Sequence, residues 1–453
     1  MKQDENFKHC KSVFILKQYA MNSTQYNTGQ PDKSLSPENT TKPNNNSACP
    51  PGKPASPMAA ALCRWTYYYS FLVLLLVVLS AQGSFVNDMY TPALPSMCRF
   101  FGCSVPLGQL GLTMGMIGLG IGQVVLGPVS DKYGRRPVLI GATALFVIAA
   151  IASIFSPNIH VFNFCRFFQG VGASVGYFMA KTIPADVYSG RQLARLMALV
   201  GAINGIAPAS APVIGGFVAD AAGWKMIFII LAVFSLVVIF LSVKMKESLP
   251  VANRNRGSIF APFRNYPILL RNKPFMVHTL LKAFALGLLF AYISSSPFIL
   301  ETHYGMSQTN YGLLVGANSL FLAAGSILSL KFKPYKRAAF IGSLIVAFGV
   351  IGLTFALYLV DNLWVYDFFM VVILFAAGMI FATSNTLAMN EGRKHSGEAA
   401  AIIGVAGYIV GGTVSPLVGM GNLLHSAALV NIFLAVMVVF FAFASKRQPA
   451  DLD

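Results

Sequence analysis

The sequence predicts an all-α polytopic membrane protein. Hydrophobic residues fill 55% of the 453 positions and charged residues only 11%, too few to cover a water-soluble globule of this length. Apolar runs of about 20 residues, the length that crosses roughly 30 Å of hydrocarbon, recur between short polar loops. Basic residues concentrate in every second loop, which is the pattern expected of successive membrane spans.

Twelve such runs predict twelve transmembrane helices. A long basic connection, residues 247–273, falls midway and separates a six-helix half at 61–246 from a second at 274–445, followed by a tail at 446–453. The segment that starts at Arg135 recurs loosely at Lys336, which indicates a duplicated half. The runs begin near Trp65, Leu107, Pro137, Val161, Gln192, Trp224, Pro274, Thr309, Ala338, Trp364, Glu398 and Asn422.

Residues 1–60 differ from the rest because they are rich in Asn, Ser, Thr, Pro and Lys and have little apolar periodicity. This composition predicts a disordered extension, and its short apolar patch cannot serve as a signal peptide. Met58 directly precedes the first span, so either Met1 or Met58 can be the start. The loop charges place both termini in the cytoplasm, and they explain the net charge of +17 without nucleic acid.

The first span ends with its single acid, Asp88, beside a proline-bent segment. Burial favours the protonated carboxyl, whereas a nearby arginine favours the ionised one. An Asp88 that alternates between Arg166 and a drier cavity could therefore bind and release a proton. The alternative is an interfacial residue or a helix cap.

The loop between the second and third spans joins glycines, one acid and three bases. Glycines allow close approach of two helix ends, and Asp131 can cap a helix or pair with an arginine. A salt-bridged latch and an ordinary basic loop are both compatible with this pattern. At the corresponding loop of the second half, Phe332 stands where Asp131 would be. The candidate gating residues are Gly127, Asp131, Lys132, Gly134, Arg135 and Arg136.

The fourth and fifth spans each carry unusual residues. Burying Arg166 in a membrane costs about 2.5–3.5 kcal/mol, so we expect it to face a partner or a wet cavity, unless it snorkels to the interface. Gln169 and Gly170 follow it on the same span. In the fifth span, small residues permit close helix contact and prolines bend the axis. Those residues are Gly201, Gly205, Pro212, Gly215 and Gly216.

Aromatic and polar residues of the fourth, seventh and eighth spans are candidates for a substrate cavity. Among them, Lys282 either favours anionic substrates or snorkels to the cytoplasmic face. His278 is expected to be interfacial, and acids near outer helix ends are expected to be solvated: Asp220, Glu301, Asp361 and Asp367. The cavity candidates are Tyr177, Phe178, Lys282, Phe284, Phe290, Tyr292 and Asn318.

The sequence offers no pattern for metal binding or catalysis. The six cysteines and six histidines are scattered, and no phosphate-binding glycine loop is present. Cys98 and Cys103 share an outer loop, where a disulfide is possible in an oxidising compartment. A non-transporting sensor would need a folded cytoplasmic domain, which residues 1–60 do not provide.

Four motifs resemble one family. Residues 127–136 match G-x-x-x-D-[RK]-x-G-R-[RK], the signature loop of the major facilitator superfamily. Residues 166–170 match the R-x-x-Q-G of its proton-coupled members, and residues 201–216 look like its antiporter motif, departing at Ala211. Residues 88–95, D-M-Y-x-P-A-L-P, resemble the first span of the Bcr/CflA drug exporters.

This resemblance covers about residues 60–445 and implies the major facilitator fold, with twelve helices in two pseudo-symmetric halves. It further implies a monomeric exporter in the bacterial inner membrane that exchanges protons for hydrophobic drugs. Asp88 and Arg166 would couple the proton, and the gradient would replace any cofactor. A narrow-specificity metabolite or siderophore exporter and a proton symporter remain alternatives on the same fold.

Overall fold

The computed structural model describes residues 57–255, 257, 264, 266–329 and 331–447. Most of the extension predicted to be disordered lies outside these residues, although 57–60 already belong to the first described helix. The chain divides into two compact units at Val73 and Leu74. The described part of the first unit is a helical stretch, and the packing reported below concerns the second unit.

Twelve helices of 20 or more residues make up the described chain. From the second onward, each begins within three residues of its predicted start. The first begins before Trp65, because the polar residues ahead of that tryptophan are already helical. The helices are α2 (Pro57–Asp88), α4 (Val105–Tyr133), α5 (Arg135–Ile154), α6 (Ile159–Val187), α7 (Gly190–Ala222), α8 (Trp224–Lys244), α10 (Lys273–Pro297), α11 (Gln308–Ser329), α12 (Tyr335–Phe355), α13 (Leu363–Glu391), α14 (Ser396–Val418) and α15 (Leu423–Lys446).

Shorter elements connect or extend these helices. The 3₁₀-helix η1 (Thr91–Ala93) and α3 (Leu94–Phe101) continue from α2, and η2 (Val251–Asn253) and α9 (Tyr266–Arg271) belong to the central connection. The π-helices η4 (Phe298–His303) and η5 (Ala356–Val360) prolong α10 and α12, and the 3₁₀-helix η6 (Arg393–His395) precedes α14. Eleven helices of the described chain are long and apolar enough to span a membrane. The twelfth, α6, is less apolar because it carries Arg166 and other polar residues.

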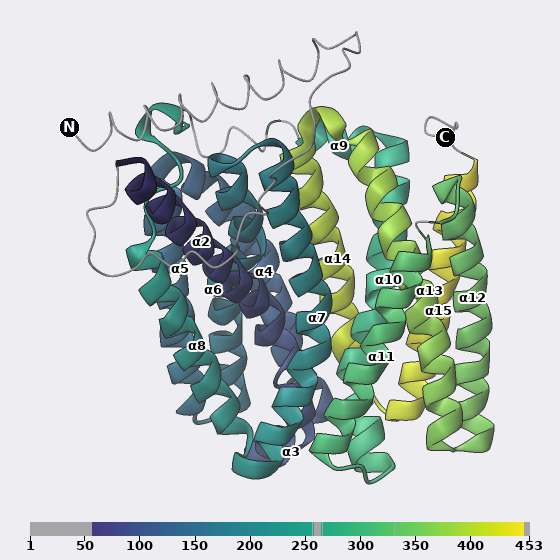
Figure 1. Cartoon of the computed structure of the whole chain (residues 1–453). Coiled ribbons are helices and arrows are strands. Elements are labelled where there is room, and N and C mark those ends of the chain that lie inside the picture. The colour runs from purple at the N-terminus through teal and green to yellow at the C-terminus, as the bar shows by residue number, and fades with distance from the viewer. Residues whose placement is uncertain (1–56, 256, 258–263, 265, 330, 448–453) are drawn as a thin grey trace, which may run out of the picture. The chain divides into compact units, whose positions relative to one another are not determined.

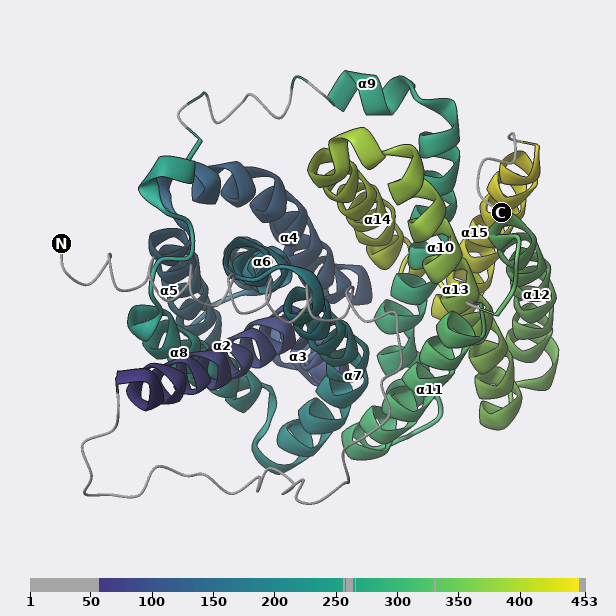
Figure 2. The same cartoon turned by 45° about the horizontal axis from the view of Figure 1, so that its top comes forward.

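The long helices form two groups with the same internal packing (Figures 1 and 2). In the amino-terminal group α4 and α5 both pack on α6, and α5 also packs on α8. In the carboxy-terminal group α11 and α12 both pack on α13, and α12 also packs on α15. The two groups meet through α4 with α14 and through α7 with α11. This repetition is what a duplicated half predicts.

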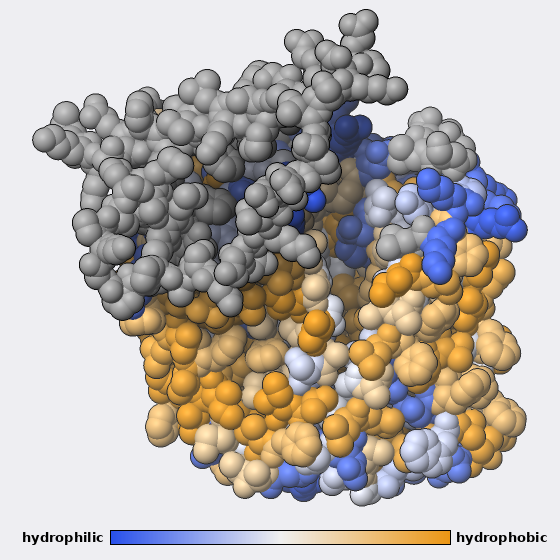
Figure 3. Space-filling view, in the orientation of Figure 1, coloured by the Kyte–Doolittle hydropathy of each residue, from blue (hydrophilic) through white to orange (hydrophobic). Residues whose placement is uncertain are grey.

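Side chains sort between the interior and the exterior of the bundle. Each half has its own hydrophobic core, with Tyr90 and Phe162 in the first and Tyr292 and Tyr311 in the second. Hydrophobic residues also cover a broad band of the face in Figure 3, and hydrophilic residues gather beyond it. An exterior of this kind fits hydrocarbon rather than water.

The bundle has two unlike ends. The basic end carries the connections α4–α5, α6–α7, α8–α10, α11–α12 and α13–α14, and it lies at the top of Figure 1. The opposite end carries the connections α3–α4, α5–α6, α7–α8, η4–α11, η5–α13 and α14–α15.

Candidate functional site

Arg166 lies on α6 and is fully buried. Its Nη1 donates to Gln169 Oε1 at 2.5 Å, and its Nη2 donates to Asn87 Oδ1 at 3.0 Å and to the Val86 carbonyl at 2.8 Å. The guanidinium carbon also lies 4.2 Å from the centre of the Tyr90 ring. Arg166 therefore does not snorkel, and a neutral shell holds its charge.

That shell is incomplete. Arg166 Nε finds no hydrogen-bond partner within the described chain, and none of the ion pairs found there includes Arg166. A buried guanidinium without a carboxylate is costly, because neutral acceptors offset only part of its desolvation. The site therefore holds a buried positive charge that no ion pair found in the described chain compensates.

Asp88 is the nearest acid in sequence to this shell, at the end of α2. Its side chain is half-buried, and its charge is within interaction range of Tyr90 and Tyr177 in the amino-terminal half and of Tyr311 and Tyr408 in the carboxy-terminal half. Its backbone carbonyl accepts a hydrogen bond from Thr91 Oγ1 at 2.8 Å. Asp88 therefore directly follows Asn87, a partner of Arg166, but forms no ion pair with Arg166 in this conformation.

Gly170 brings α4 and α6 into close contact. A Cβ at this position would collide with the Gly115 carbonyl, and one at Gly118 would collide with the Phe167 carbonyl. A small residue at both positions lets the two backbones touch, as in other tightly packed membrane helices. This contact supports α6 beside Arg166 and gives Gly170 a packing role.

The predicted gating loop forms an ionic cluster at the basic end. Arg135 lies at its centre, with Nη1 2.5 Å from Asp131 Oδ1 and Nε 3.0 Å from Asp186 Oδ2. Nη1 also donates to Ser130 Oγ at 2.6 Å. Arg135 is buried although Asp131 is nearly half exposed, so the cluster joins the loop to the end of α6.

Glu247 completes this cluster from the segment after α8. Its carboxylate accepts the backbone N–H of Arg135 at 2.8 Å and that of Arg136 at 3.2 Å, which caps α5 with a negative charge at its positive end. It also lies 3.6 Å from Arg254 Nη2. Gly134 has a φ of +106° and is crowded by Glu247 and Arg254, so this turn needs glycine.

The remaining loop residues have lesser contacts. The Gly127 carbonyl accepts from Ser130 Oγ at 2.7 Å, and Lys132 Nζ lies 5.9 Å from the centre of the Tyr133 ring. Arg136 Nη2 donates to the Val243 carbonyl at 2.5 Å. Asp186 and Glu247 were not predicted from the sequence, where their only signal is that they are acids among the many bases of the basic end.

The small residues of α7 behave differently along its length. Cβ atoms at Gly215 and Gly216 would collide with the Met89 and Gln308 carbonyls, whereas Gly201 and Gly205 face open space. Pro212 lies where α7 meets α11, because a Cβ on Gly312 would collide with its carbonyl. Only the opposite-end part of α7 is therefore packed tightly in this conformation.

The cavity candidates do not all come together. Tyr177 and Phe290 pack against the core of the amino-terminal half, and Phe178 is half-buried beside Tyr177. Tyr292 and Asn318 are almost fully buried in the other half, where Asn318 Nδ2 donates to Tyr292 Oη at 3.0 Å. The ring of Phe284 stacks on that of Phe441 on α15, with the ring centres 5.5 Å apart.

Two expectations about polar residues are wrong. Asp367 is buried, with 9% of its surface exposed, because it lies one turn inside α13 and accepts from Asn318 Nδ2 at 2.6 Å. Asp220, by contrast, is exposed as expected, and it also accepts from the Thr309 backbone N–H at 2.7 Å and caps α11. His278 is buried rather than interfacial, and its Nε2 lies 3.0 Å from Ser445 Oγ.

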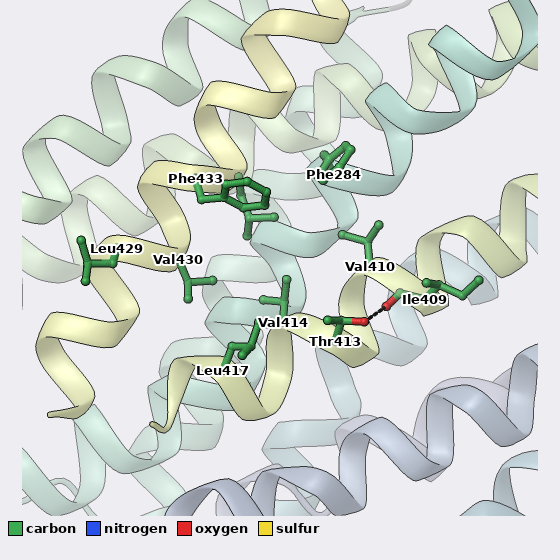
Figure 4. A pocket seen from close by; sticks show the side chains of 10 residues that line it. Phe284, Ile409, Val410, Thr413, Val414, Leu417, Leu429, Val430 and Phe433 are labelled. Carbon is green, nitrogen blue, oxygen red and sulfur yellow. Dashed lines mark hydrogen bonds between the residues drawn. The ribbon is translucent and has the colours of Figure 1, made fainter. Parts of the chain in front are cut away.

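A cavity of about 380 Å³ lies elsewhere, between α10, α14 and α15 (Figure 4). Phe284, Val410 and Val430 line it. The hydroxyl of Thr413 also lines it but already donates a hydrogen bond to the Ile409 carbonyl at 2.8 Å. Ile409 and Leu429 are more than half exposed, so the cavity opens to the bundle exterior. It has no charged lining and lies apart from Asp88 and Arg166.

Cys98, Cys103 and Cys165 are free thiols, so Cys98 and Cys103 are not joined. Among the residues that the structure describes, no three potential metal ligands lie together.

Comparisons with known proteins identify the family. The sequence profile of the Major Facilitator Superfamily matches residues 73–416. The MFS-type transporter YdgK of Bacillus subtilis is 33% identical over 364 residues, covering 78% of this chain and 89% of that protein. The multidrug resistance protein D of Escherichia coli is 27% identical over 359 residues, covering 77% of this chain and 88% of that protein.

A solved structure shows the same fold. The xylose transporter XylE of Escherichia coli superimposes with a TM-score of 0.65 at 15% identity, over 84% of this chain and 98% of that one. The predicted all-α fold in two six-helix halves is thereby confirmed. We conclude that the chain is a multi-pass membrane transporter, not an enzyme, and belongs to the Major Facilitator Superfamily.

Proposed function

We propose that this transporter exports hydrophobic compounds in exchange for protons. In this proposal the basic end faces the cytoplasm, which agrees with the distribution of Lys and Arg among the loops. Relatives named for multidrug and chloramphenicol resistance support export of such compounds. The residues 88–95 that resemble the Bcr/CflA exporters, and the span-five residues that resemble the antiporter motif, support the same direction of transport.

The observation that carries the proposal is a fully buried Arg166 with no carboxylate partner, whose contact Asn87 is directly followed in the chain by a half-buried Asp88. An ionised Asp88 is attracted to Arg166, whereas a protonated Asp88 is not. Proton binding would therefore change how the end of α2 interacts with α6. Asp88 is the proposed proton carrier, and Arg166 the positioning charge.

Alternating access would connect this site to one side at a time. In the present conformation α4 with α14 and α7 with α11 hold the two halves together. Gln109 Nε2 donates to the Ser294 carbonyl at 2.8 Å, and Thr113 Oγ1 donates to the Gly412 carbonyl at 2.8 Å. Rocking of one half against the other would break these contacts and form others at the basic end.

The experiment uses inside-out vesicles that hold a pH gradient, to which candidate drugs are added. We expect the parent protein to dissipate the gradient and Asp88→Asn to fail, because an amide cannot exchange the proton. Asp361→Asn removes an exposed acid at the opposite end and is the matched control.

The results separate the alternatives. Dissipation that persists in Asp88→Asn would contradict Asp88 as the carrier and move the proton site elsewhere. A parent protein that responds to no drug but does respond to a single metabolite or siderophore would favour the narrow-specificity exporter. Gradient-driven uptake in the direction of proton flow would favour a symporter.

A further inference from the structure

A second buried acid lies outside the proposed coupling pair. Asp367 is on α13, one turn from the helix start at the opposite end, and only 9% of its surface is exposed. Asn318 of α11 donates its Nδ2 to Asp367 Oδ1 at 2.6 Å. The same nitrogen donates to Tyr292 Oη of α10 at 3.0 Å. Three helices of the carboxy-terminal half thus meet at one carboxyl group.

The surroundings of this carboxyl group are apolar. Asn318 and Tyr292 are each only 2% exposed. Val315, one turn before Asn318, and Met370, one turn after Asp367, belong to the hydrophobic core of this half, as does Tyr292. A negative charge in such a place is costly unless a cation compensates it.

The ion pairs found in the described chain do not include Asp367. Lys282 on α10 does reach α13, but its Nζ donates to Asn385 Oδ1 at 2.7 Å, and Asn385 lies about 27 Å further along the helix at 1.5 Å per residue. The other basic and acidic side chains of α13 and of the helices packed on it also lie toward the basic end: Lys273, His278, Lys336, Arg337, Glu391 and Glu398. These residues therefore leave the Asp367 carboxyl without a counter-charge.

The remaining titratable groups around α13 supply no positive charge to Asp367. At the exposed surface of the opposite end His303 pairs with Asp361, and Glu301 in η4 is an acid. The other groups are tyrosines, which are neutral near neutral pH. They are Tyr292, Tyr311, Tyr335, Tyr358 and Tyr408 on the elements packed against α13, Tyr366 on α13 itself and Tyr304 after η4.

The partners of Asp367 suit either form of its carboxyl group. An ionised carboxylate accepts from Asn318 Nδ2, as in this conformation. A protonated carboxyl is also a donor, and an Asn318 amide that turns over presents its oxygen as the acceptor. The Tyr292 hydroxyl can follow this change, because it donates as well as accepts. The acids of the gating loop cluster differ, since they face the permanent charge of Arg135.

We propose that Asp367 is a proton-binding site of the carboxy-terminal half, and that Asn318 and Tyr292 are positioning residues that adapt to its protonation state. Its role in transport rests on the proposed function, to which it adds a second proton in the half that lacks Asp88. The helix that carries Asn318, α11, packs on α7 of the other half. The protonation state of Asp367 therefore acts on a helix that joins the two halves.

The test follows the C=O stretching band of protonated carboxyl groups by infrared spectroscopy, in full-length protein in nanodiscs at a series of pH values. Every variant also carries Asp88→Asn, so that the proposed carrier contributes nothing. We expect a band that gains and loses intensity across about pH 5–8, the range in which proteins are usually most stable. Asp367→Asn should remove this band. Asp361→Asn, which removes an exposed acid of the same end, is the matched control and should keep it.

Replacement of Asn318 separates proton binding from packing. Asn318→Leu and Asn318→Ala both remove the donor to the ionised carboxylate. We expect Asp367 then to bind its proton roughly tenfold more tightly, which moves the midpoint of the band up by about one pH unit. Tyr292→Phe keeps that donor and should move the midpoint less. Thermal unfolding shows which variants are folded.

The proposal is overturned if Asp367→Asn and the Asp88→Asn background give the same spectra at every pH, because Asp367 would then keep one protonation state throughout. It is also overturned if a folded Asn318 variant leaves the midpoint unchanged. The measurement needs neither drug nor pH gradient and is made without Asp88. Failure here is therefore distinct from failure of drug-driven proton exchange in vesicles.

Discussion

The two ends of the bundle are held by different chemistry. At the opposite end the halves touch each other through hydrogen bonds, including Gln308 Nε2 to Ser96 Oγ at 3.2 Å and Thr309 N–H to Asp220 Oδ2 at 2.7 Å. At the basic end the ionic cluster around Arg135 joins α4, α5, α6 and the segment after α8, all within one half.

This difference distinguishes the contacts between the halves, which must break during alternating access, from the contacts within one half, which can persist throughout it. A single hydrogen bond contributes about 0.5–1.5 kcal/mol net, so the opposite-end contacts can open one after another. A buried ion cluster is harder to open, because removing one partner leaves another charge without compensation. The gating loop is therefore better described as a rigid part of one half, and the opposite-end contacts as the closure between halves.

The largest expected effect is that of Arg135→Ala. This change leaves Asp186 and Asp131 without their partner. We expect the free energy of unfolding to fall by about 2 kcal/mol. That is below the usual range for breaking a fully buried pair, because Asp131 is partly exposed. Thermal unfolding in detergent measures it. The double variant Arg135→Ala, Asp186→Asn should recover part of the loss, whereas strictly additive losses would show that the two residues are not coupled.

The second prediction uses the two parts of α7. Gly216→Ala places a methyl group against the Gln308 carbonyl across the interface between the halves. We expect this overpacking to destabilise the closed opposite end by about 1–2 kcal/mol and so to open it. Gly201→Ala faces open space and should change nothing in this conformation. Distances between spin labels on the two halves at the opposite end report the opening.

The control variant Gly201→Ala also tests the other state of the transporter, in which the basic end is closed. If alternating access closes the basic end, Gly201→Ala should disfavour that closed state and slow transport, although it leaves the present conformation intact. Equal opening of the opposite end by both variants would mean that the glycines act through helix flexibility rather than through contact.

How far sequence reasoning reached depends on whether a feature is local. Helix positions were predictable because length and hydropathy are properties of one segment, as the exact start at Trp224 illustrates. Arg166 stood out because an arginine in an apolar run is costly. Its partners were not predictable: Asn87 and Gln169 are ordinary residues until α2 and α6 are placed side by side.

The errors have the same origin. Asp367 was assigned to solvent because it stands near a helix end, yet Asn318 on another helix covers it. Asp186 and Glu247 were overlooked because each is distant in sequence from Arg135. Contacts of this kind depend on which helices pack together, and no periodicity along a single helix encodes that.

The third prediction concerns the cap across the halves. Asp220→Ala removes the acceptor of the Thr309 N–H and of its hydroxyl, and loss of a helix cap costs about 1 kcal/mol. We expect a smaller opening of the opposite end than Gly216→Ala causes, in the same spin-label distance. Asp220→Asn keeps an acceptor, so its opening of the opposite end should lie between that of the parent protein and that of the alanine variant. If the asparagine variant opens this end as widely as the alanine variant does, the effect comes from loss of the charge rather than from loss of the acceptor.

The smallest effect is expected for the exposed pair at the same end. His303 Nε2 lies 2.7 Å from Asp361 Oδ1, and this hydrogen bond lowers the pKa of the Asp361 carboxyl. A lowered pKa in the folded state stabilises the protein above the ordinary carboxyl pKa, and that contribution disappears as the pH falls through the folded value. Because the carboxylate is largely exposed, the contribution is small at every pH.

Parent and Asp361→Asn proteins should therefore unfold at nearly the same temperature near neutral pH, and any small difference should close only in acid, below about pH 4. Thermal unfolding between neutral pH and about pH 3 measures this. A difference that instead changes around the pKa of an ordinary histidine, about 6.5, would mean that protonation of His303 controls the pair. The opposite end would then carry a titratable contact of its own, and its contrast with the charged basic end would be one of location rather than of chemistry.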